Sequence, residues 1–551
     1  MMPPIIESAE SQSLENGIGQ SNEIRGALGT ISHHHFIPGS PYVRKFRTLL
    51  AILGPGLIVM SGDNDAGAFS IYTQAGQNFG TALLWTLLLL VPVIYINQEM
   101  VLRLGAVSGV GHARLIFERF GKFWGTFSVI DLFLLNALTI VTEFIGISLG
   151  LDYLGIPKLL GVAASAGIIM LTASTGDFRR FERFTLFLVF GSVLLVPLFL
   201  MVHPPMGQMV HDFFVPGIPK GGSSGSVLLL VIAIVGTTIA PWQLFFQQSY
   251  VIDKRITARF IKYERIDLWI GIAIVVAGAA AMMGIASSTF TGHPEVGMFT
   301  DVGSVASGIS KYHGHLAGVL FAIALIDACI VGASAVSLST AYALGDVFSI
   351  RHSLHKKPTD AVGFYAIFFG LLVLAVVLVS APGVPLGLLT NMVQTLAGVL
   401  LPSATVFLLL LCNDKAVLGP WVNSRSVNVF TAVIVTVLIL LSAILTTSEL
   451  FPQMSGRTMT KLIVSGIVIG GLTAFAVRFF ERTRSTGSPV KAGLVDTSRE
   501  NWRMPPLDQL PPVRFSLSSR VWMVVLRTYL GVAGGLLFYK LIHLALSGAV
   551  R

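Results

Sequence analysis

The sequence predicts an all-α polytopic membrane protein, and two observations support this fold class. Over 551 residues the hydrophobic fraction is 53%, only 12% of the residues are charged, and the mean hydropathy is +0.77. These values lie outside the range of water-soluble domains. Apolar runs long enough to cross a bilayer recur from about Thr48 to Val477, and roughly twelve of them meet the 20-residue criterion.

Positive charges alternate along the chain and predict its orientation. One cluster of Lys and Arg precedes the first apolar run and others follow the even-numbered runs, whereas intervening loops such as 72–81 and 380–385 carry almost none. By the positive-inside rule the N-terminus is cytoplasmic, and we expect a multi-pass protein of the plasma or inner membrane. The net charge of +9 is then a matter of topology and does not predict nucleic-acid binding. The clusters lie at 44–47, 103–122, 179–183, 254–265, 351–357 and 478–484.

The two ends of the chain differ in composition from the apolar middle. Residues 1–43 are polar and lack an apolar core of signal-peptide type, which predicts a disordered cytoplasmic tail. Residues 485–519 are rich in Pro, Ser and Arg and predict a cytoplasmic linker. The last apolar segment, 520–551, contains Arg527 and Lys540, so it either crosses the membrane or lies in the interface.

The stretch SGDNDAGAFS, residues 61–70, places Asp63 and Asp65 between glycines inside an apolar region. The run Thr48–Met60 is too short to cross the membrane, and the apolar pattern resumes at Ala68–Ala75, which predicts a broken helix. In hydrocarbon an unwound backbone is tolerated only where it is buried in protein or lines a polar cavity. A carboxylate at such a place usually has a function.

A second broken helix is predicted five spans later, in IVGTTIAPWQLFFQQ, residues 234–248. Pro241 removes an amide donor, and Gly236, Thr237 and Thr238 supply flexibility and hydroxyl groups just before it. Because five is an odd number of spans, the two broken helices run in opposite directions. This is the inverted-repeat arrangement of the LeuT-type fold, with a substrate site at the two breaks.

The predicted domain organisation follows from this arrangement. Residues 44–413 form a core of about ten spans, built from two inverted five-helix repeats at about 44–203 and 225–413. Residues 426–481 add spans 11 and 12. At the breaks, freed carbonyl groups face a cation and an aspartate supplies the countercharge.

From Gly54 to about Asn413 the sequence resembles the NRAMP divalent-metal transporters. The motifs GPGLIVMSGDNDAGAFSIYTQAG, LRLGAVSG, EFIGISLGL, APWQL and QTLAGVLLP occur in the family's order and at similar spacing. The resemblance implies a transporter of divalent metal ions that works by alternating access in a lipid bilayer. It implies no enzymatic activity and no cofactor beyond the transported ion.

The resemblance also implies a ligand set, from which this chain departs at several positions. The family carries Asp-Pro-Gly-Asn at the first break and Met-Pro-His at the second, so an asparagine, a thioether and a histidine are absent here. The family's acidic pair in the third span is reduced to Glu143, with Ile140 in place of the aspartate. Gln394 matches a glutamine of the tenth span. The matching residues at the breaks are Asp65, Ala66, Gly67 and Ala68, and Ala240, Pro241 and Trp242.

These substitutions change the predicted cation. Without a soft thioether the site consists of oxygens, and two alanines widen it, which suits Mg²⁺ because this ion keeps several waters. The set of changes resembles the NRAMP-related magnesium transporters, so we expect transport of partly hydrated Mg²⁺ and also of Mn²⁺. The predicted metal-binding residues are Asp65, Ala240 through its carbonyl, Thr237, Thr238, Gln394, Asp63 and Gln243. The predicted site-lining residues are Gly67, Ala68, Pro241 and Trp242.

Some of these roles have structural alternatives. Asp65 could cap a helix, and Asp63 either contacts coordinated water or caps the half-helix that follows it. The hydroxyl groups of Thr237 and Thr238 often bond back to the preceding turn. The two cysteines, Cys329 and Cys412, lie in apolar runs and are expected to be packing residues.

Proton coupling is not expected, because Trp242 and Ile140 cannot carry a proton. Two further intramembrane acids remain possible sites. Glu143 either hydrogen-bonds a neighbouring helix or carries a proton. Asp327, in the eighth span, could attract cations, restore coupling or pair with a buried donor such as Asn136.

Other classes of function fit less well. The sequence has no His-Glu-x-x-His motif of a metalloenzyme and no repeated charge rings of an ion channel. A proton-coupled Mn²⁺/Fe²⁺ carrier of the same family and a LeuT-type transporter of an organic substrate remain open. The carboxylate of Asp65 favours a cation over an organic anion.

Overall fold

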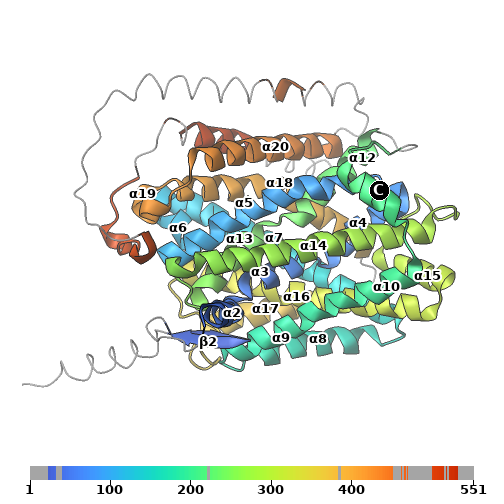
Figure 1. The fold of residues 1–551 in the computed structure, drawn as a ribbon, viewed down its shortest axis with the longest axis horizontal. Helices are drawn as coiled ribbons and strands as arrows, with labels where there is room; N and C mark the ends of the chain where they lie inside the picture. Colours follow the sequence, from blue (N-terminus) through green and yellow to red (C-terminus); the bar gives the residue numbers. More distant parts are fainter. Residues whose placement is uncertain are drawn as a thin grey trace, which may run out of the picture.

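Long helices lie side by side along one axis of the molecule in this computed structural model (Figure 1). The structure describes residues 23–32, 40–219, 224–381, 386–450, 461, 464–466, 468, 499–513, 517 and 520–531. The elements are β1 (Glu23–Gly26), β2 (Gly29–Ser32), α2 (Pro41–Ile52), α3 (Pro55–Ser61), α4 (Ala66–Phe79), α5 (Trp85–Ser108), α6 (His112–Phe120), α7 (Lys122–Tyr153), α8 (Lys158–Ala173), α9 (Phe178–Gly191), η1 (Ser192–Leu194), α10 (Leu195–Val202), α11 (Met206–Phe214), α12 (Ser224–Thr238), α13 (Pro241–Asp253), η2 (Ala258–Phe260), α14 (Ile261–Phe290), α15 (Val302–His313), α16 (His315–Val347), α17 (Val362–Ser380), α18 (Leu386–Cys412), α19 (Lys415–Leu418), η3 (Gly419–Trp421), α20 (Arg425–Leu450), η4 (Arg499–Asn501) and η5 (Leu507–Gln509).

The described helices account for most of the roughly twelve predicted membrane spans. In the described part of the chain, 8 helices are long and apolar enough to cross a membrane, or up to 9 if a bent pair at α18–α19 counts as one span. The predicted core corresponds to the broken pair α3–α4, then α5, α7, α8, α9–α10, α12–α13, α14, α16, α17 and α18. The eleventh span is α20, and most of the predicted twelfth lies outside the described residues.

The two broken helices cross each other in opposite directions. The first half of one, α3, packs against α13, which is the second half of the other, and α4 packs against α12. Two spans broken at the same depth pack in this way only when they run antiparallel. The all-α, LeuT-type fold with inverted repeats is therefore confirmed. Nearly all residues of α3 and α13 are buried, so the breaks lie inside the protein.

The first span begins later than predicted. The run Thr48–Met60 is divided, because α2 ends at Ile52 and α3 starts at Pro55. Proline cannot continue the preceding helix, and Gly54 between them has φ 153°, which favours glycine. Figure 1 views α2 along its axis while α5 and α14 run across the view, so α2 lies crosswise to the bundle.

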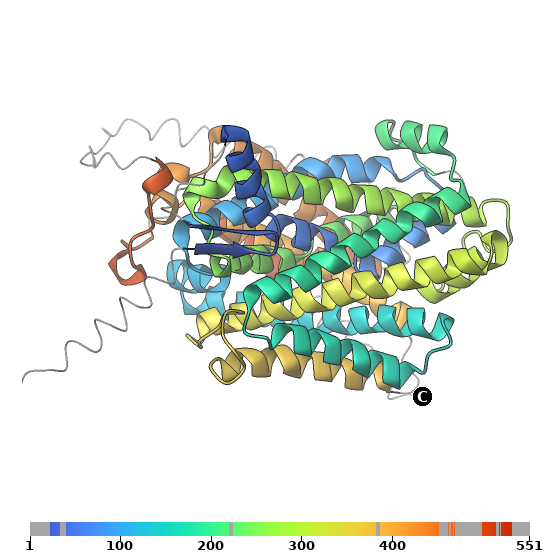
Figure 2. The ribbon, with the colours of Figure 1, turned by 60° about the horizontal axis from the view of Figure 1, so that its bottom comes forward.

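Part of the predicted disordered tail is folded, which corrects that prediction for residues 23–32. Strands β1 and β2 pair antiparallel across a turn at Ala27 and Leu28. Ile24, Ala27 and Ile31 are buried, and the hairpin contacts α2 and α9. Tertiary contacts that composition does not reveal therefore order this segment. Figure 2 shows the hairpin beside α2 at one end of the bundle, which we call the hairpin end.

Part of the predicted linker 485–519 is also packed against the bundle. The backbone carbonyl of Arg499 accepts a hydrogen bond from Trp421 Nε1 at 2.8 Å, and that of Pro511 accepts one from Arg119 Nη1 at 2.8 Å. In the final segment, residues 520–531 are described and Leu526 is fully buried. Residues 532–551 lie outside the described part of the chain.

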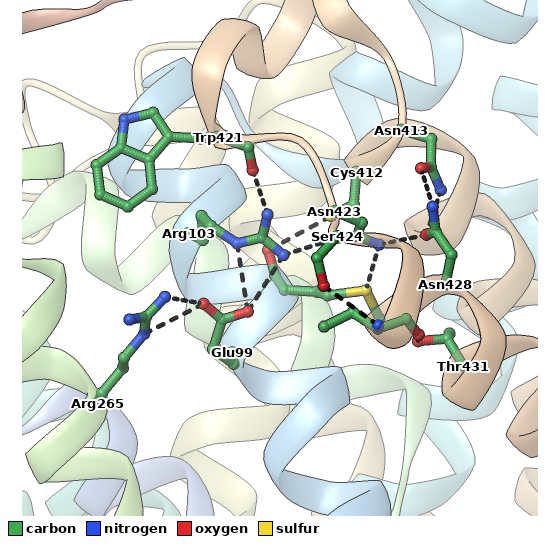
Figure 3. A network of polar contacts seen from close by, with 12 residues as sticks. Glu99, Arg103, Arg265, Cys412, Asn413, Trp421, Asn423, Ser424, Asn428 and Thr431 are labelled. Atoms are coloured by element: carbon green, nitrogen blue, oxygen red, sulfur yellow. Dashed lines mark hydrogen bonds and ion pairs between the residues drawn. The ribbon is translucent and has the colours of Figure 1, made fainter. Parts of the chain in front are cut away.

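A buried polar network joins α5, α14 and the connection from α18 to α20 (Figure 3). Glu99 accepts hydrogen bonds from Arg103 at 3.2 Å and from Arg265 at 2.6 Å. The Arg103 guanidinium also donates to the carbonyl of Trp421 and, at 2.6 Å, to Asn423 Oδ1. Because the Arg103 side chain is only 5% exposed, its charge is balanced inside the protein. This network fixes those helices to one another.

Candidate metal site at the two helix breaks

Asp65 lies at the first break and starts α4. Its Oδ1 accepts a hydrogen bond from the backbone N–H of Ala68 at 2.9 Å, and its side chain is the N-cap of the helix. The residue is 4% exposed. The positive end of the α4 dipole favours the carboxylate here. Of the two aspartates, Asp65 is therefore the cap, which corrects the alternative that gave this role to Asp63.

Asp63 connects the first break to α13. Its Oδ1 accepts a hydrogen bond from Gln243 Nε2, and Gln243 Oε1 accepts one from Gln98 Nε2 at 2.9 Å. Asp63 Oδ2 is buried and has no hydrogen-bond partner in the described part of the chain. Gln98 was missed by sequence reasoning, although a polar residue inside the second apolar span was a signal for it.

The second break frees a different carbonyl group from the one predicted. Ala240 is the N-cap of α13, and its carbonyl accepts a hydrogen bond from the N–H of Gln243 at 3.2 Å. Pro241 has no N–H, so the residue four positions earlier, Thr237, loses the donor that its carbonyl would have in a continuous helix. The Ala240 carbonyl is therefore engaged rather than freed, and its role as a metal ligand stays a prediction, as does that of Thr237. Among the described residues, Thr237 Oγ1 also has no partner.

Thr238 has its hydroxyl group engaged. Thr238 Oγ1 donates to the carbonyl of Ile234 at 2.5 Å, the bond back to the preceding turn that such residues often make. Tyr72 Oη lies 2.7 Å from Thr238 Oγ1, and since the threonine hydrogen is already used, Tyr72 is the donor. This contact joins α4 to α12. Tyr72 was missed by sequence reasoning, although it lies two helical turns after Asp65.

Glu143 and Cys329 lie beside the first break. Glu143 Oε2 accepts a hydrogen bond from the N–H of Ala66 at 3.2 Å, so it does bond a neighbouring helix. Its carboxyl group also interacts with the carboxyl group of Asp65 and with the thiol of Cys329. Cys329 is buried and packs against Gly146, so the expected packing role places its thiol beside the first break. Contacts between α7 and α16, which sequence reasoning could not predict, place the thiol here.

Gln394 and Trp242 line the breaks. The Gln394 side chain lies so close to Gly67 that a Cβ atom at residue 67 would collide with its amide, which explains the glycine. Trp242 is buried and its ring lies next to Gly62. Its carbonyl accepts a hydrogen bond from Ser339 Oγ at 2.9 Å.

The profile described as natural resistance-associated macrophage protein-like matches residues 56–448. The chain belongs to the Nramp family. A divalent metal cation transporter MntH of Latilactobacillus sakei is 28% identical over 426 residues, covering 72% of this chain and 88% of the relative. An MntH of Bacillus subtilis is 26% identical over 417 residues, covering 73% and 93%. A crystal structure of the Eremococcus coleocola manganese transporter shares the fold with a TM-score of 0.64 at 22% identity, covering 83% of this chain and 98% of that one.

In this Nramp protein Asp327 lies away from the breaks. Its carboxyl group lies against Gly191, where a Cβ atom would collide with it. Asn136, the proposed partner, instead donates to Thr340 Oγ1 at 2.9 Å. The predicted pairing with Asn136 is therefore wrong, because Asn136 and Asp327 occupy different positions around the bundle.

The site of this Nramp chain is poor in the usual metal ligands. Within the described residues, no group of three or more His, Cys, Asp and Glu side chains could hold a metal ion. The breaks instead bring together one capped carboxylate at Asp65, a half-paired carboxylate at Asp63 and a carbonyl without its helical donor at Thr237. Such a set of oxygens suits a hard cation that retains part of its water.

Proposed function

We propose that this chain transports partly hydrated Mg²⁺, and also Mn²⁺, by alternating access between the two helix breaks. Three features of the two breaks carry the proposal: Asp65 lies at one break, Pro241 removes the donor that would pair with the Thr237 carbonyl at the other, and residues 62–68 and 236–242 contain no sulfur. The MntH relatives, named as divalent metal cation transporters, support the substrate class.

Two buried oxygen atoms at the breaks that lack hydrogen-bond partners support a hydrated ion. Asp63 Oδ2 and Thr237 Oγ1 are buried oxygens without hydrogen-bond partners among the described residues. Such groups cost free energy unless water or an ion satisfies them. Mg²⁺ releases its waters reluctantly and usually keeps several, so its hydration shell would donate to both oxygens. The small side chains of Ala68 and Ala240 leave room for those waters.

We further propose that transport is driven by the membrane potential. Trp242 and Ile140 are buried and neither can carry a proton. Two charges crossing about 100 mV gain about 4 to 5 kcal/mol, which corresponds to about a thousandfold in concentration. With the positive charges in the cytoplasm, the hairpin end faces the cytoplasm and this potential drives uptake into the cell.

The contact between Glu143 and Asp65 favours a second candidate, a proton-coupled Mn²⁺/Fe²⁺ carrier. Glu143 is fully buried and lies next to Asp65, so a cation that binds Asp65 changes the charge that Glu143 experiences. A proton released from Glu143 would then accompany the metal. The two candidates differ in one measurable quantity, the movement of protons.

Flux into proteoliposomes tests both candidates. Vesicles containing a metal indicator and a pH dye receive Mg²⁺ or Mn²⁺ under an inside-negative potential. We expect both ions to enter vesicles that contain the native protein, without acidification of the vesicle interior. Asp65→Ala should abolish this entry. Asp327→Asn is the matched control, because it removes an intramembrane carboxylate outside the site, and it should retain flux.

Two results would contradict the proposal. Entry of Mn²⁺ without Mg²⁺ would refute the proposed substrate. Metal-dependent acidification that disappears in Glu143→Gln would establish the proton-coupled alternative.

A further inference from the structure

We propose that the hairpin of residues 23–32 is a latch that holds the hairpin end of the transport pathway closed. The latch would limit the rate at which α3 moves away from α13. The effect on transport rests on the proposed function, whereas the effect on α3 does not.

The turn of the hairpin is held through the backbone N–H and the backbone carbonyl of Ala27. The N–H of Ala27 donates to Glu182 Oε2 at 2.5 Å, and the carbonyl of Ala27 accepts a hydrogen bond from Arg183 Nε at 3.0 Å. Both side chains belong to α9, and Glu182 is fully buried. These are charge-assisted hydrogen bonds, which are stronger than neutral ones. The hairpin is therefore bound to α9 at a defined position.

The same glutamate extends the contact to the second broken helix. Lys254, at the end of α13, donates to Glu182 Oε1 at 2.7 Å and to the carbonyls of Ile52 and Leu53 at 2.7 and 2.9 Å. The side chains of Lys254 and Glu182 are both 0% exposed. One buried ion pair thus joins the hairpin, α9, α13 and the end of α2.

The start of α3 is fixed at the same place. Gly54 precedes α3, and a Cβ atom there would collide with Glu182 Oε1. The N–H groups of Gly54 and Gly56 donate to Asp267 of α14 at 3.1 and 2.6 Å. The start of α3 therefore cannot leave α14 while these contacts persist.

The hairpin also covers the connection that must bend if α3 moves. The backbone of Gly26 lies against Ala51 of α2, where a Cβ atom would collide with the Ala51 carbonyl oxygen. Alternating access in this fold moves one group of helices against another around a central site. An ion at the breaks can leave at the hairpin end only if α3 separates from α13. The hairpin opposes this separation because it binds α2, which leads into α3, and is joined through Glu182 and Lys254 to the end of α13.

Variants in which the hairpin cannot pack against α2, or is absent, test the latch. Gly26→Val places a side chain against the backbone of Ala51, so the hairpin cannot dock, and deletion of residues 1–32 removes it altogether. Leu28→Ser is the matched control, because Leu28 is 52% exposed at the same turn. Amide hydrogen exchange of residues 57–61 in the full-length protein in lipid reports the opening of α3, and metal flux reports transport.

We expect exchange of the α3 amides to accelerate at least tenfold and initial Mn²⁺ or Mg²⁺ entry to rise at least threefold in both latch variants. Leu28→Ser should match the native protein. Unchanged exchange in both variants would overturn the latch, as would flux that falls together with the melting temperature, because the hairpin would then be a structural brace. Faster exchange in the two latch variants, together with a native protein that transports no Mg²⁺, would refute the proposed substrate while supporting the latch.

Discussion

The two helix breaks contribute different chemistry to the same site. The first break carries two carboxylates, Asp65 and Asp63, each already engaged by one protein donor. The second carries no charge in residues 236–242 and supplies the Thr237 carbonyl. One repeat therefore provides the countercharge and the other provides neutral oxygens and space. Changes at the first break should decide whether a cation binds, and changes at the second should decide which cation binds.

The largest effect is expected from Asp65→Asn, which separates charge from capping. Asparagine is a good N-cap and can still accept the hydrogen bond from Ala68, so α4 should remain intact. Without the charge, the bound cation loses about 3 kcal/mol or more, which corresponds to a reduction of about 100-fold in uptake at low metal concentration. Metal flux measures the loss, and the melting temperature should stay close to that of the native protein. Retained flux would mean that the cap, and not the charge, is what this residue contributes.

A tenfold effect on selectivity is expected from Ala240→Met at the second break. A thioether is a soft ligand that favours Cd²⁺ over hard cations, so the ratio of Cd²⁺ to Mg²⁺ uptake should rise about tenfold, a change of about 1.4 kcal/mol. Ala240→Leu is the matched control, because it adds similar volume without sulfur. If leucine shifts the ratio as much as methionine does, cavity size and not ligand softness controls selection.

The sequence predicted the parts of this architecture that depend on local chemistry. Glycines around Asp63 and Asp65 and the proline at residue 241 identified both breaks, because each interrupts the helical hydrogen-bond pattern. The rule that proline frees the carbonyl four residues earlier also identifies Thr237, although the carbonyl of Ala240 was predicted instead. The sequence alone therefore points to both carbonyl groups, and only Ala240 is seen to accept a hydrogen bond from Gln243.

Other features depend on contacts between distant segments and were not predictable. The hairpin is ordered because Glu182 and Arg183 bind the backbone of Ala27, a contact across 155 residues of chain for Glu182. Cys329 reaches the first break because α16 packs along α7. A single sequence contains no signal for either pairing.

The smallest effect on cation selectivity is expected from Cys329→Ser. This substitution tests whether the first break also provides a soft ligand. The thiol interacts with Glu143 and packs against Gly146, so its contacts are made on the α7 side of the break. Serine keeps a small polar side chain beside Glu143 and removes the sulfur. The ratio of Cd²⁺ to Mg²⁺ uptake should therefore change by less than about twofold, or about 0.4 kcal/mol. A selective loss of Cd²⁺ uptake would identify the thiol as a ligand. The first break would then supply a soft ligand as well as the charge, and cation selection could no longer be assigned to the second break alone.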